Sequence, residues 1–145
     1  MKRLILLFTL LVASVSAFAY EGYGTCKIPG TDSYLEGTAY ISNSGSHLSG
    51  NLVITNGHSK PLQSASIKVI VNYEWKTSHT SPYDGGKVVN KGRKSLTLYD
   101  SRWTGNIAGY QSGKVDLSGT LSLPEGAYDI KIDSIDVSIN NPYCN

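Results

Sequence analysis

The stretch that decides the fold is LPEGAYDIKIDSIDVSI, residues 123–139. A Pro-Glu-Gly turn is followed by apolar residues at every second position, the pattern of a β-strand with one buried face. The inward set is Tyr128, Ile130 and Ile132 and then, after a slip of one residue, Ile135, Val137 and Ile139. We therefore expect a β-bulge at Asp133-Ser134 or a bend there between two sheets, with a two-residue hairpin as the alternative.

The rest of the chain after the N-terminal segment shows no helical periodicity. Short β-rich runs alternate with clusters of Gly, Asn, Ser and Pro, at a spacing typical of a sandwich or barrel. The further candidate strands are residues 34–41, 51–55, 65–76, 94–101 and 114–123, with a short run at 88–89. The fold class predicted is all-β, a single antiparallel β-sandwich of about seven to eight strands.

The clearest of these strands is ASIKVIVNYEWK, residues 65–76. Its apolar residues alternate with polar ones, which predicts a dry and a wet face. Ile70 interrupts the polar face, so we expect a central or partly covered strand. Residues 77–86 are predicted to form a long loop and residues 102–113 an irregular connection. Gly119, at an inward position, predicts a bulge or a closely approaching backbone.

The Leu-Pro-Glu-Gly-Ala-Tyr turn at residues 123–128 resembles the corner of immunoglobulin-like and fibronectin type III-like sandwiches. In those folds a tyrosine near the start of a late strand bonds back to upstream backbone. The resemblance implies an immunoglobulin-like β-sandwich with Tyr128 as the structural corner tyrosine. It covers this turn and the general strand spacing, and the Cys-Trp-Cys spacing of antibody domains is absent, so it concerns the superfold and no particular family.

Residues 1–19, MKRLILLFTLLVASVSAFA, have the three parts of a secretory signal peptide: a basic start, an apolar run and a small-residue cleavage site. The apolar run is short for a membrane span, which needs about 20 residues. We expect cleavage after Ala19, with Ala17 as the alternative, and a single domain over residues 20–145. The predicted location is secreted or periplasmic, with no stable membrane span after cleavage.

The charge of the exported part is balanced. Loss of Lys2 and Arg3 lowers the number of Lys and Arg residues from 13 to the same 11 that Asp and Glu contribute. Nucleic-acid binding needs clustered basic residues, so we expect no nucleic-acid partner. One local cluster, Lys87, Lys91, Arg93 and Lys94, is interpreted as a solvated loop and strand edge.

Two cysteines, Cys26 and Cys144, stand near the two ends of the exported part. An even pair of cysteines in an exported protein predicts a disulfide. Closing a loop on the order of 100 residues would stabilise the fold by about 4–5 kcal/mol in the chain-entropy model. The alternatives are pairing between molecules and two free thiols, although a C-x-x-C redox spacing is absent.

The sequence contains no pattern typical of catalysis or metal binding. His47, His58 and His79 lie among Ser, Gly and Asn, outside any G-x-S-x-G context, and their spacing does not suit a zinc site. The aspartates of residues 129–136 do not match a calcium-binding loop, and the four glutamates give no recognisable catalytic pair. We therefore expect no enzyme activity, no cofactor and no metal.

The aromatic residues of the exported part are tyrosines and tryptophans, which serve packing and recognition alike. Tyr83 lies in the predicted long loop, and Trp103 and Tyr110 lie in the irregular connection. One hypothesis is that the three form a binding patch; the other is that Trp103 plugs the end of the sandwich and the tyrosines cover it. The sequence favours a non-catalytic protein-binding module, with a carbohydrate-binding or adhesive surface module as the alternative, so the partner is another protein or a glycan.

Overall fold

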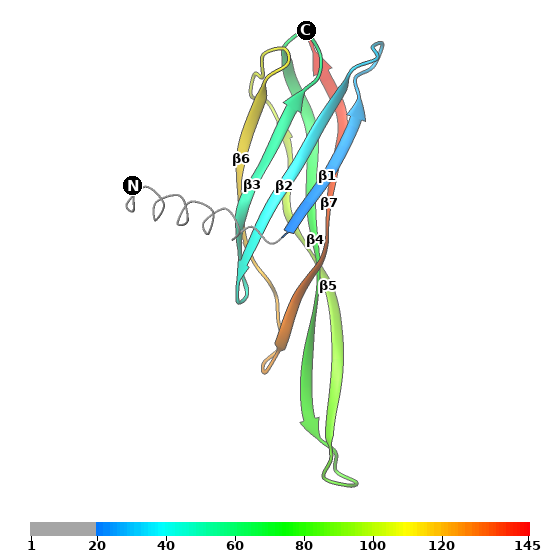
Figure 1. Cartoon of the computed structure of the whole chain (residues 1–145), viewed down its shortest axis with the longest axis vertical. Coiled ribbons are helices and arrows are strands. Elements are labelled where there is room, and N and C mark those ends of the chain that lie inside the picture. Colours follow the sequence, from blue (N-terminus) through cyan, green and yellow to red (C-terminus); the bar gives the residue numbers. More distant parts are fainter. Residues whose placement is uncertain (1–19) are drawn as a thin grey trace, which may run out of the picture.

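A computed structural model describes residues 20–145, which form seven β-strands (Figure 1). The strands are β1 (Tyr20–Lys27), β2 (Tyr34–Ser44), β3 (His47–Asn56), β4 (Leu62–Thr80), β5 (Lys87–Trp103), β6 (Ser112–Thr120) and β7 (Tyr128–Cys144). They make two antiparallel sheets, one in the order β1-β2-β3-β6 and one in the order β5-β4-β7. The all-β class predicted from the sequence is confirmed. The predicted signal peptide, residues 1–19, lies outside the described residues.

The apolar core lies between the two sheets. Strand β4 is the centre of its sheet and turns Ile67, Val69 and Val71 inward, each at most 1% exposed. The central position confirms the prediction drawn from Ile70. The facing sheet contributes Leu35, Ala39, Ile41, Leu48, Leu52, Ile54 and Leu117. No helix within residues 20–145 has the length and apolar character needed to cross a membrane.

Strand β7 is continuous and contains the bulge that the sequence predicted. Asn72 of β4 pairs with Ser134, whereas the next residue, Tyr73, pairs with Ile132, so Asp133 is the extra residue. A bulge lets the alternation change phase without ending the strand. Ile132 and Ile135 can therefore both reach the core, where they are 6% and 7% exposed.

Strand β1 was not predicted, because its inward positions carry glycines instead of large apolar residues. A Cβ atom on Gly22 would overlap Ile135 of β7, and one on Gly24 would overlap the carbonyl oxygen of Val137. The two glycines therefore let β1 and β7, edge strands of opposite sheets, lie side by side along one flank of the sandwich (Figure 1). Gly119 in β6 is also a glycine at an inward position with a close neighbour, but that neighbour is the side chain of Leu98 and not a backbone.

The predicted long loop at residues 77–86 is largely wrong. Strand β4 continues to Thr80 and pairs with β5 as far as Lys87, so only residues 81–86 form the connection. The runs predicted at 88–89 and 94–101 are parts of one strand, β5. The polar sequence of this region suggested a loop because both faces of the hairpin are open to solvent.

The strand order differs from that of an immunoglobulin constant-type sandwich. In that fold the first sheet contains strands 1, 2, 5 and 4 and the second contains strands 3, 6 and 7. Here β2 and β3 form a hairpin within one sheet, with Ser44 opposite His47. What the chain shares with the immunoglobulin-like architecture is the coarser feature of two antiparallel sheets.

The corner role predicted for Tyr128 is carried by a different tyrosine. Tyr128 begins β7, is 38% exposed, and lies with its ring centre 5.7 Å from the Lys87 ammonium nitrogen. Tyr73, which is 2% exposed, makes the hydrogen bonds to backbone at this corner, through Ser122. The turn sequence before Tyr128 was therefore a misleading signal.

The predicted disulfide is not present in the structure, in which Cys26 and Cys144 are free thiols. The two residues belong to different sheets, since Cys26 lies in β1 and Cys144 ends β7. The Cys144 sulfur is 4.0 Å from Oδ1 of Asn56, while the Cys26 sulfur is 3.6 Å from the carbonyl oxygen of Lys27. Partial burial raises the pKa of the Cys144 thiol.

Candidate functional site

The three aromatic residues predicted to form one patch lie at opposite ends of the molecule. Tyr83 is at the tip of the β4–β5 hairpin and is 98% exposed. Trp103 pairs with Ala65 near the other end of β4, roughly 50 Å away at about 3.3 Å per strand residue. Tyr110 is near that far end too, where its N–H donates to the carbonyl of His58 at 3.1 Å. The predicted patch is therefore wrong as a single surface.

At the far end, Trp103 is half-buried and packs against the core. A Cβ atom on Gly105 would meet the Trp103 ring at 2.5 Å, so the ring lies tightly over the chain that follows β5. This placement agrees with the alternative that Trp103 plugs the sandwich end. Tyr110 is 69% exposed in a turn where its φ is 59°, so it is a surface residue.

The loops at this end are held by Asn56, which is fully buried. Its amide nitrogen donates to the carbonyls of Lys60 at 2.9 Å, Ile107 at 3.2 Å and Ala108 at 3.4 Å. Its amide oxygen accepts from the N–H of His58 at 3.0 Å. The Asn56 side chain thus bonds to the loop after β3 and to the loop after β5. Sequence analysis missed this role because a single Asn before Gly is typical of an ordinary turn.

The histidines do not come together. His47 starts β3, His58 lies in the following loop and accepts a hydrogen bond from the Lys60 N–H at 2.9 Å, and His79 lies near the end of β4. Nδ1 of His79 is 3.3 Å from the side-chain nitrogen of Asn90. Within residues 20–145, no three His, Cys, Asp or Glu side chains are grouped closely enough to hold a metal ion.

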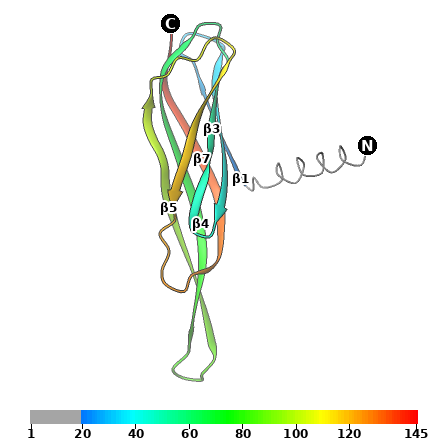
Figure 2. The ribbon, with the colours of Figure 1, turned by 90° about the vertical axis from the view of Figure 1, so that its left-hand side faces the viewer.

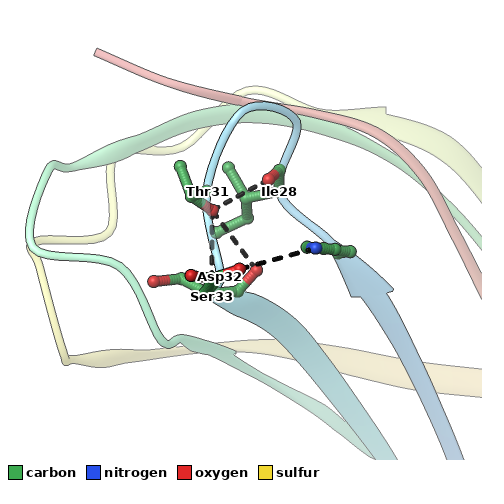
Figure 3. Close-up of polar contacts among 5 residues, drawn as sticks. Ile28, Thr31, Asp32 and Ser33 are labelled. Atoms are coloured by element: carbon green, nitrogen blue, oxygen red, sulfur yellow. Dashed lines mark hydrogen bonds and ion pairs between the residues drawn. The ribbon is translucent and has the colours of Figure 1, made fainter.

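A depression of about 430 Å³ lies at the turn between β1 and β2, lined by residues 27–32. Figure 3 shows the polar contacts among residues of this turn. Pro29 and Gly30 form the centre of a type II turn, because Gly30 has φ 75° and the Thr31 N–H donates to the Ile28 carbonyl at 3.2 Å. The Thr31 hydroxyl donates to the same carbonyl at 2.8 Å and accepts from the Ser33 N–H at 3.1 Å. The polar groups thus bond to one another within the turn instead of converging on a ligand.

The outer face of the four-stranded sheet carries three tyrosines, Tyr23, Tyr34 and Tyr40. Tyr23 and Tyr34 are 59% and 48% exposed. In the strand register, Tyr40 lies opposite Glu21 and Tyr23 lies opposite Thr38. A hydrogen bond to the Glu36 carboxylate raises the pKa of the Tyr23 hydroxyl. This face thus places the carboxylates of Glu21 and Glu36 near exposed tyrosine rings.

The most prominent surface is the β4–β5 arm, which we define as residues 77–90. The last pair between β4 and β7 joins Lys76 to Tyr128, so beyond it β4 pairs with β5 alone. The arm projects beyond both sheets in two perpendicular views (Figures 1 and 2). Residues 78–80 and 82–90 are exposed, including Val88 at 36% and Val89 at 48%.

The tip of the arm is tied by short-range hydrogen bonds. Ser81 donates its N–H to the Gly86 carbonyl at 2.7 Å, and its carbonyl accepts from the Gly85 N–H at 3.1 Å. Its hydroxyl oxygen accepts from the Tyr83 N–H at 3.3 Å. The carboxylate of Asp84 accepts from the Gly86 N–H at 2.9 Å, which lowers the pKa of Asp84. Tyr83 is therefore displayed on a turn with a defined shape.

The base of the arm is held by rows of polar contacts between neighbouring strands of the three-stranded sheet. In one row Lys76 bonds Asp129 at 2.7 Å, and Lys131 is 3.8 Å from the same carboxylate. In the next row Arg93 is 3.4 Å from Glu74. The contact with Asp129 raises the pKa of Lys76, and the contact with Lys76 lowers the pKa of Asp129.

A third row is centred on Asn72. Its amide nitrogen donates to the Ser134 hydroxyl at 2.9 Å and to the Asp136 carboxylate at 2.8 Å. Its amide oxygen accepts from the Ser95 hydroxyl at 2.5 Å. A depression of about 270 Å³ lies beside this row, lined by Asn72, Tyr73, Arg93, Lys94, Ser95 and Asp133. The sheet at the base of the arm is thus cross-linked from β5 to β7.

Comparison with known proteins gives no family for this chain. No protein-family model matches it, and no curated protein matches its sequence. Among solved structures it is similar to the trimeric lipoprotein SadB of Salmonella enterica, at 17% sequence identity and a TM-score of 0.35. That alignment covers 99% of this chain and 74% of the other. A likeness at this TM-score carries no argument about function.

Proposed function

We propose that the chain is an exported, non-catalytic protein-binding module and that the β4–β5 arm contacts the partner protein. The observation that carries the proposal is the arm itself, with Tyr83 98% exposed at a hydrogen-bonded tip. Protein interfaces draw much of their binding energy from a few aromatic anchors, and a tip that is already ordered has less conformational entropy to lose on binding. The N-terminal signal pattern supports export, to the periplasm or the medium.

The stability of the arm also favours contact with a partner protein. An isolated two-stranded hairpin is only marginally stable in water, because it has no further strand and no second layer against which to bury its apolar side chains. Val88 and Val89 are exposed on this hairpin, where a partner would bury them. In the free protein, the ion pairs and hydrogen bonds at the base of the arm stabilise it in place of a packed apolar layer.

A triple variant of the arm tests this proposal. Tyr83→Ser, Val88→Thr and Val89→Thr together remove the apolar side chains while keeping residues that suit a hairpin. The immobilised wild-type protein is expected to capture a defined partner from exported proteins of its native host, and the triple variant is expected to lose it by about tenfold or more. Tyr23→Ser, on the other sheet, is the matched control and should retain the partner. Equal capture by the triple variant and the wild type would refute the proposal.

A carbohydrate-binding or adhesive function is the second candidate, favoured by the outer face with Tyr23, Tyr34 and Tyr40. Sugar rings can stack on aromatic side chains, and the Glu36 carboxylate beside Tyr23 can accept hydrogen bonds from sugar hydroxyls. This candidate requires binding on a glycan array that is lost in Tyr23→Ala and kept in Tyr83→Ala. Trp103→Ala should leave glycan binding unchanged, because Trp103 packs against the core.

A further inference from the structure

We propose that the free edge of β5 between Lys87 and Lys94 binds an extended, acidic segment of a partner protein, which adds to the sheet as a further strand. The inference rests on the proposed protein-binding function and names the chemistry of the partner. It depends on three features of the described residues. These are an unpaired strand edge, a concentration of positive charge along this edge, and the absence of ion pairs for part of that charge.

The first feature is the open edge. Strand β5 is the outermost strand of its sheet and pairs only with β4. Strand β6 of the other sheet approaches β5 farther along, where Leu98 packs over Gly119. Within residues 20–145, no strand lies beside the second side of β5 from Lys87 to Lys94, so this side presents backbone N–H and C=O groups that are not paired with another strand. Such an edge is a template for pairing with an extended peptide.

The second feature is the charge of this segment. Lys87, Lys91, Arg93 and Lys94 lie within KVVNKGRK, and no acidic residue follows in β5 before Asp100. Side chains at alternate positions of a strand point to the same face, so Lys87, Lys91 and Arg93 share one face. An added strand with acidic residues at alternate positions would place its carboxylates beside them.

The third feature is that part of this charge is left without an ionic partner. The ion pairs at the base of the arm use Arg93 with Glu74, and Lys76 and Lys131 with Asp129. The Lys87 ammonium is 5.7 Å from the centre of the Tyr128 ring, and the charge of Lys91 acts on Asp129 only from beyond ion-pair distance. Within residues 20–145, Lys87 and Lys91 take part in no ion pair, and both are exposed. They are therefore free to pair with carboxylates of an incoming strand.

The same charges select the partner. If the β5 edges of two copies paired, the basic segment of one copy would lie beside the basic segment of the other, and like charges close together destabilise strand pairing. Lysine on an edge strand is a known protection against uncontrolled association. An acidic strand reverses the sign of the interaction, so this edge would reject a second β5 and accept an acidic segment. The interpretation of the cluster as a solvated strand edge holds for the free protein.

Synthetic peptides provide the test. The probe is a labelled nine-residue peptide with Glu and Val at alternate positions; one comparison peptide has Lys in place of Glu, and another has two prolines in place of valines. We expect the Glu peptide to bind on the order of tenfold more tightly than the Lys peptide, and less tightly as salt increases. The proline peptide should lose binding, since proline cannot donate to a strand ladder. Amide hydrogen exchange should slow in residues 87–94.

Variants of the protein locate the site. The double variant Lys87→Glu with Lys91→Glu should weaken binding of the Glu peptide on the order of tenfold, because both side chains lie on the face that receives the peptide's carboxylates, and the double Gln variant should weaken it by less. Lys114→Glu is the matched control, because Lys114 is an exposed lysine in β6, an edge strand of the other sheet. It should bind the Glu peptide like the wild type. Circular dichroism of each variant verifies that the fold is retained.

Several results would overturn the inference: no binding of the Glu peptide, equal binding of the Glu and proline peptides, or protection of β6 in place of β5. Full displacement by heparin together with unchanged amide exchange in β5 would indicate a general polyanion site instead of strand addition. If the Glu peptide does not bind but the arm variant still loses its captured protein, this inference alone fails. If the arm variant keeps that protein, the proposed function fails.

Discussion

Tyr73 and Ser122 exchange two hydrogen bonds that join the two sheets. The Tyr73 hydroxyl donates to the Ser122 carbonyl at 2.9 Å and accepts from the Ser122 N–H at 3.2 Å. Tyr73 lies in the middle of β4, whereas Ser122 follows the end of β6. Because the Tyr73 ring is 2% exposed, the contact fixes the chain between β6 and β7 against a rigid part of the core.

We predict that Tyr73→Phe destabilises the protein by about 1–3 kcal/mol, because it leaves both the N–H and the carbonyl of Ser122 without their partner in a partly buried place. Urea denaturation followed by fluorescence measures the free energy of unfolding. Tyr128→Phe is the control, since it removes a hydroxyl from a residue that is 38% exposed, and it should change stability by less than about 0.5 kcal/mol. The opposite ranking would return the corner role to Tyr128.

Gly24 is predicted to be intolerant of any side chain. A Cβ atom there would overlap the Val137 carbonyl oxygen, so β1 would have to move away from β7. We expect Gly24→Ala to destabilise the fold by about 1–3 kcal/mol and to speed amide exchange in β1. Thr25→Ala, at the next and exposed position, should have a much smaller effect. Similar losses for the two variants would mean that the contact between β1 and β7 is adaptable.

Asn56→Asp is expected to destabilise the protein by at least about 3 kcal/mol at pH 7, because a buried carboxylate would face the carbonyls of Lys60, Ile107 and Ala108 in place of a donor. Such surroundings raise the pKa of the introduced carboxyl in the folded state. The loss is therefore complete at neutral pH and becomes smaller as pH falls towards 4. Chemical denaturation at pH 7 and pH 4 measures both values; a loss independent of pH would contradict this explanation.

Sequence reasoning predicted the parts of the fold in which alternation is strong. The pattern around Ile70 located the central strand, and the phase slip after Ile132 located the bulge at Asp133, because each signal depends on neighbouring residues in one strand. Strand β1 could not be found this way, since Gly22 and Gly24 are inward for reasons that lie in β7, far along the chain.

The candidate site was less predictable, because it depends on how far the hairpin extends. Tyr83 was singled out from the sequence, but its distance from Trp103 follows from the long pairing of β4 with β5. The residues Thr77, Ser78, His79 and Thr80 suit a loop as well as an exposed strand, so local sequence could not decide between them. The role of Asn56 could not be predicted from local sequence either, because it depends on carbonyl groups of the distant loop at Ile107.

The ion pair between Lys76 and Asp129 makes the stability of the arm depend on pH. Because the pKa of Asp129 is lowered, chiefly by the hydrogen bond from Lys76, the contribution of Asp129 is present above its ordinary pKa of about 3.9 and is lost as pH falls through its folded value. Because the pKa of Lys76 is raised by the same contact, the contribution of Lys76 is present below about pH 10.4 and is lost as pH rises through its folded value.

Asp129→Asn removes this ion pair and keeps a residue that tolerates the positive φ of 52° at this position. We expect the variant to unfold at a lower temperature than the wild type, by a difference that is constant between about pH 5 and pH 10 and shrinks on either side. Hydrogen exchange in residues 76–91 should be faster across the same pH range. Asp100→Asn, which removes a longer and more exposed pair with Lys68 at 3.9 Å, is the control and should show little change. A difference that persists unchanged to pH 2 would show that Asp129 acts through its backbone conformation and not through its charge.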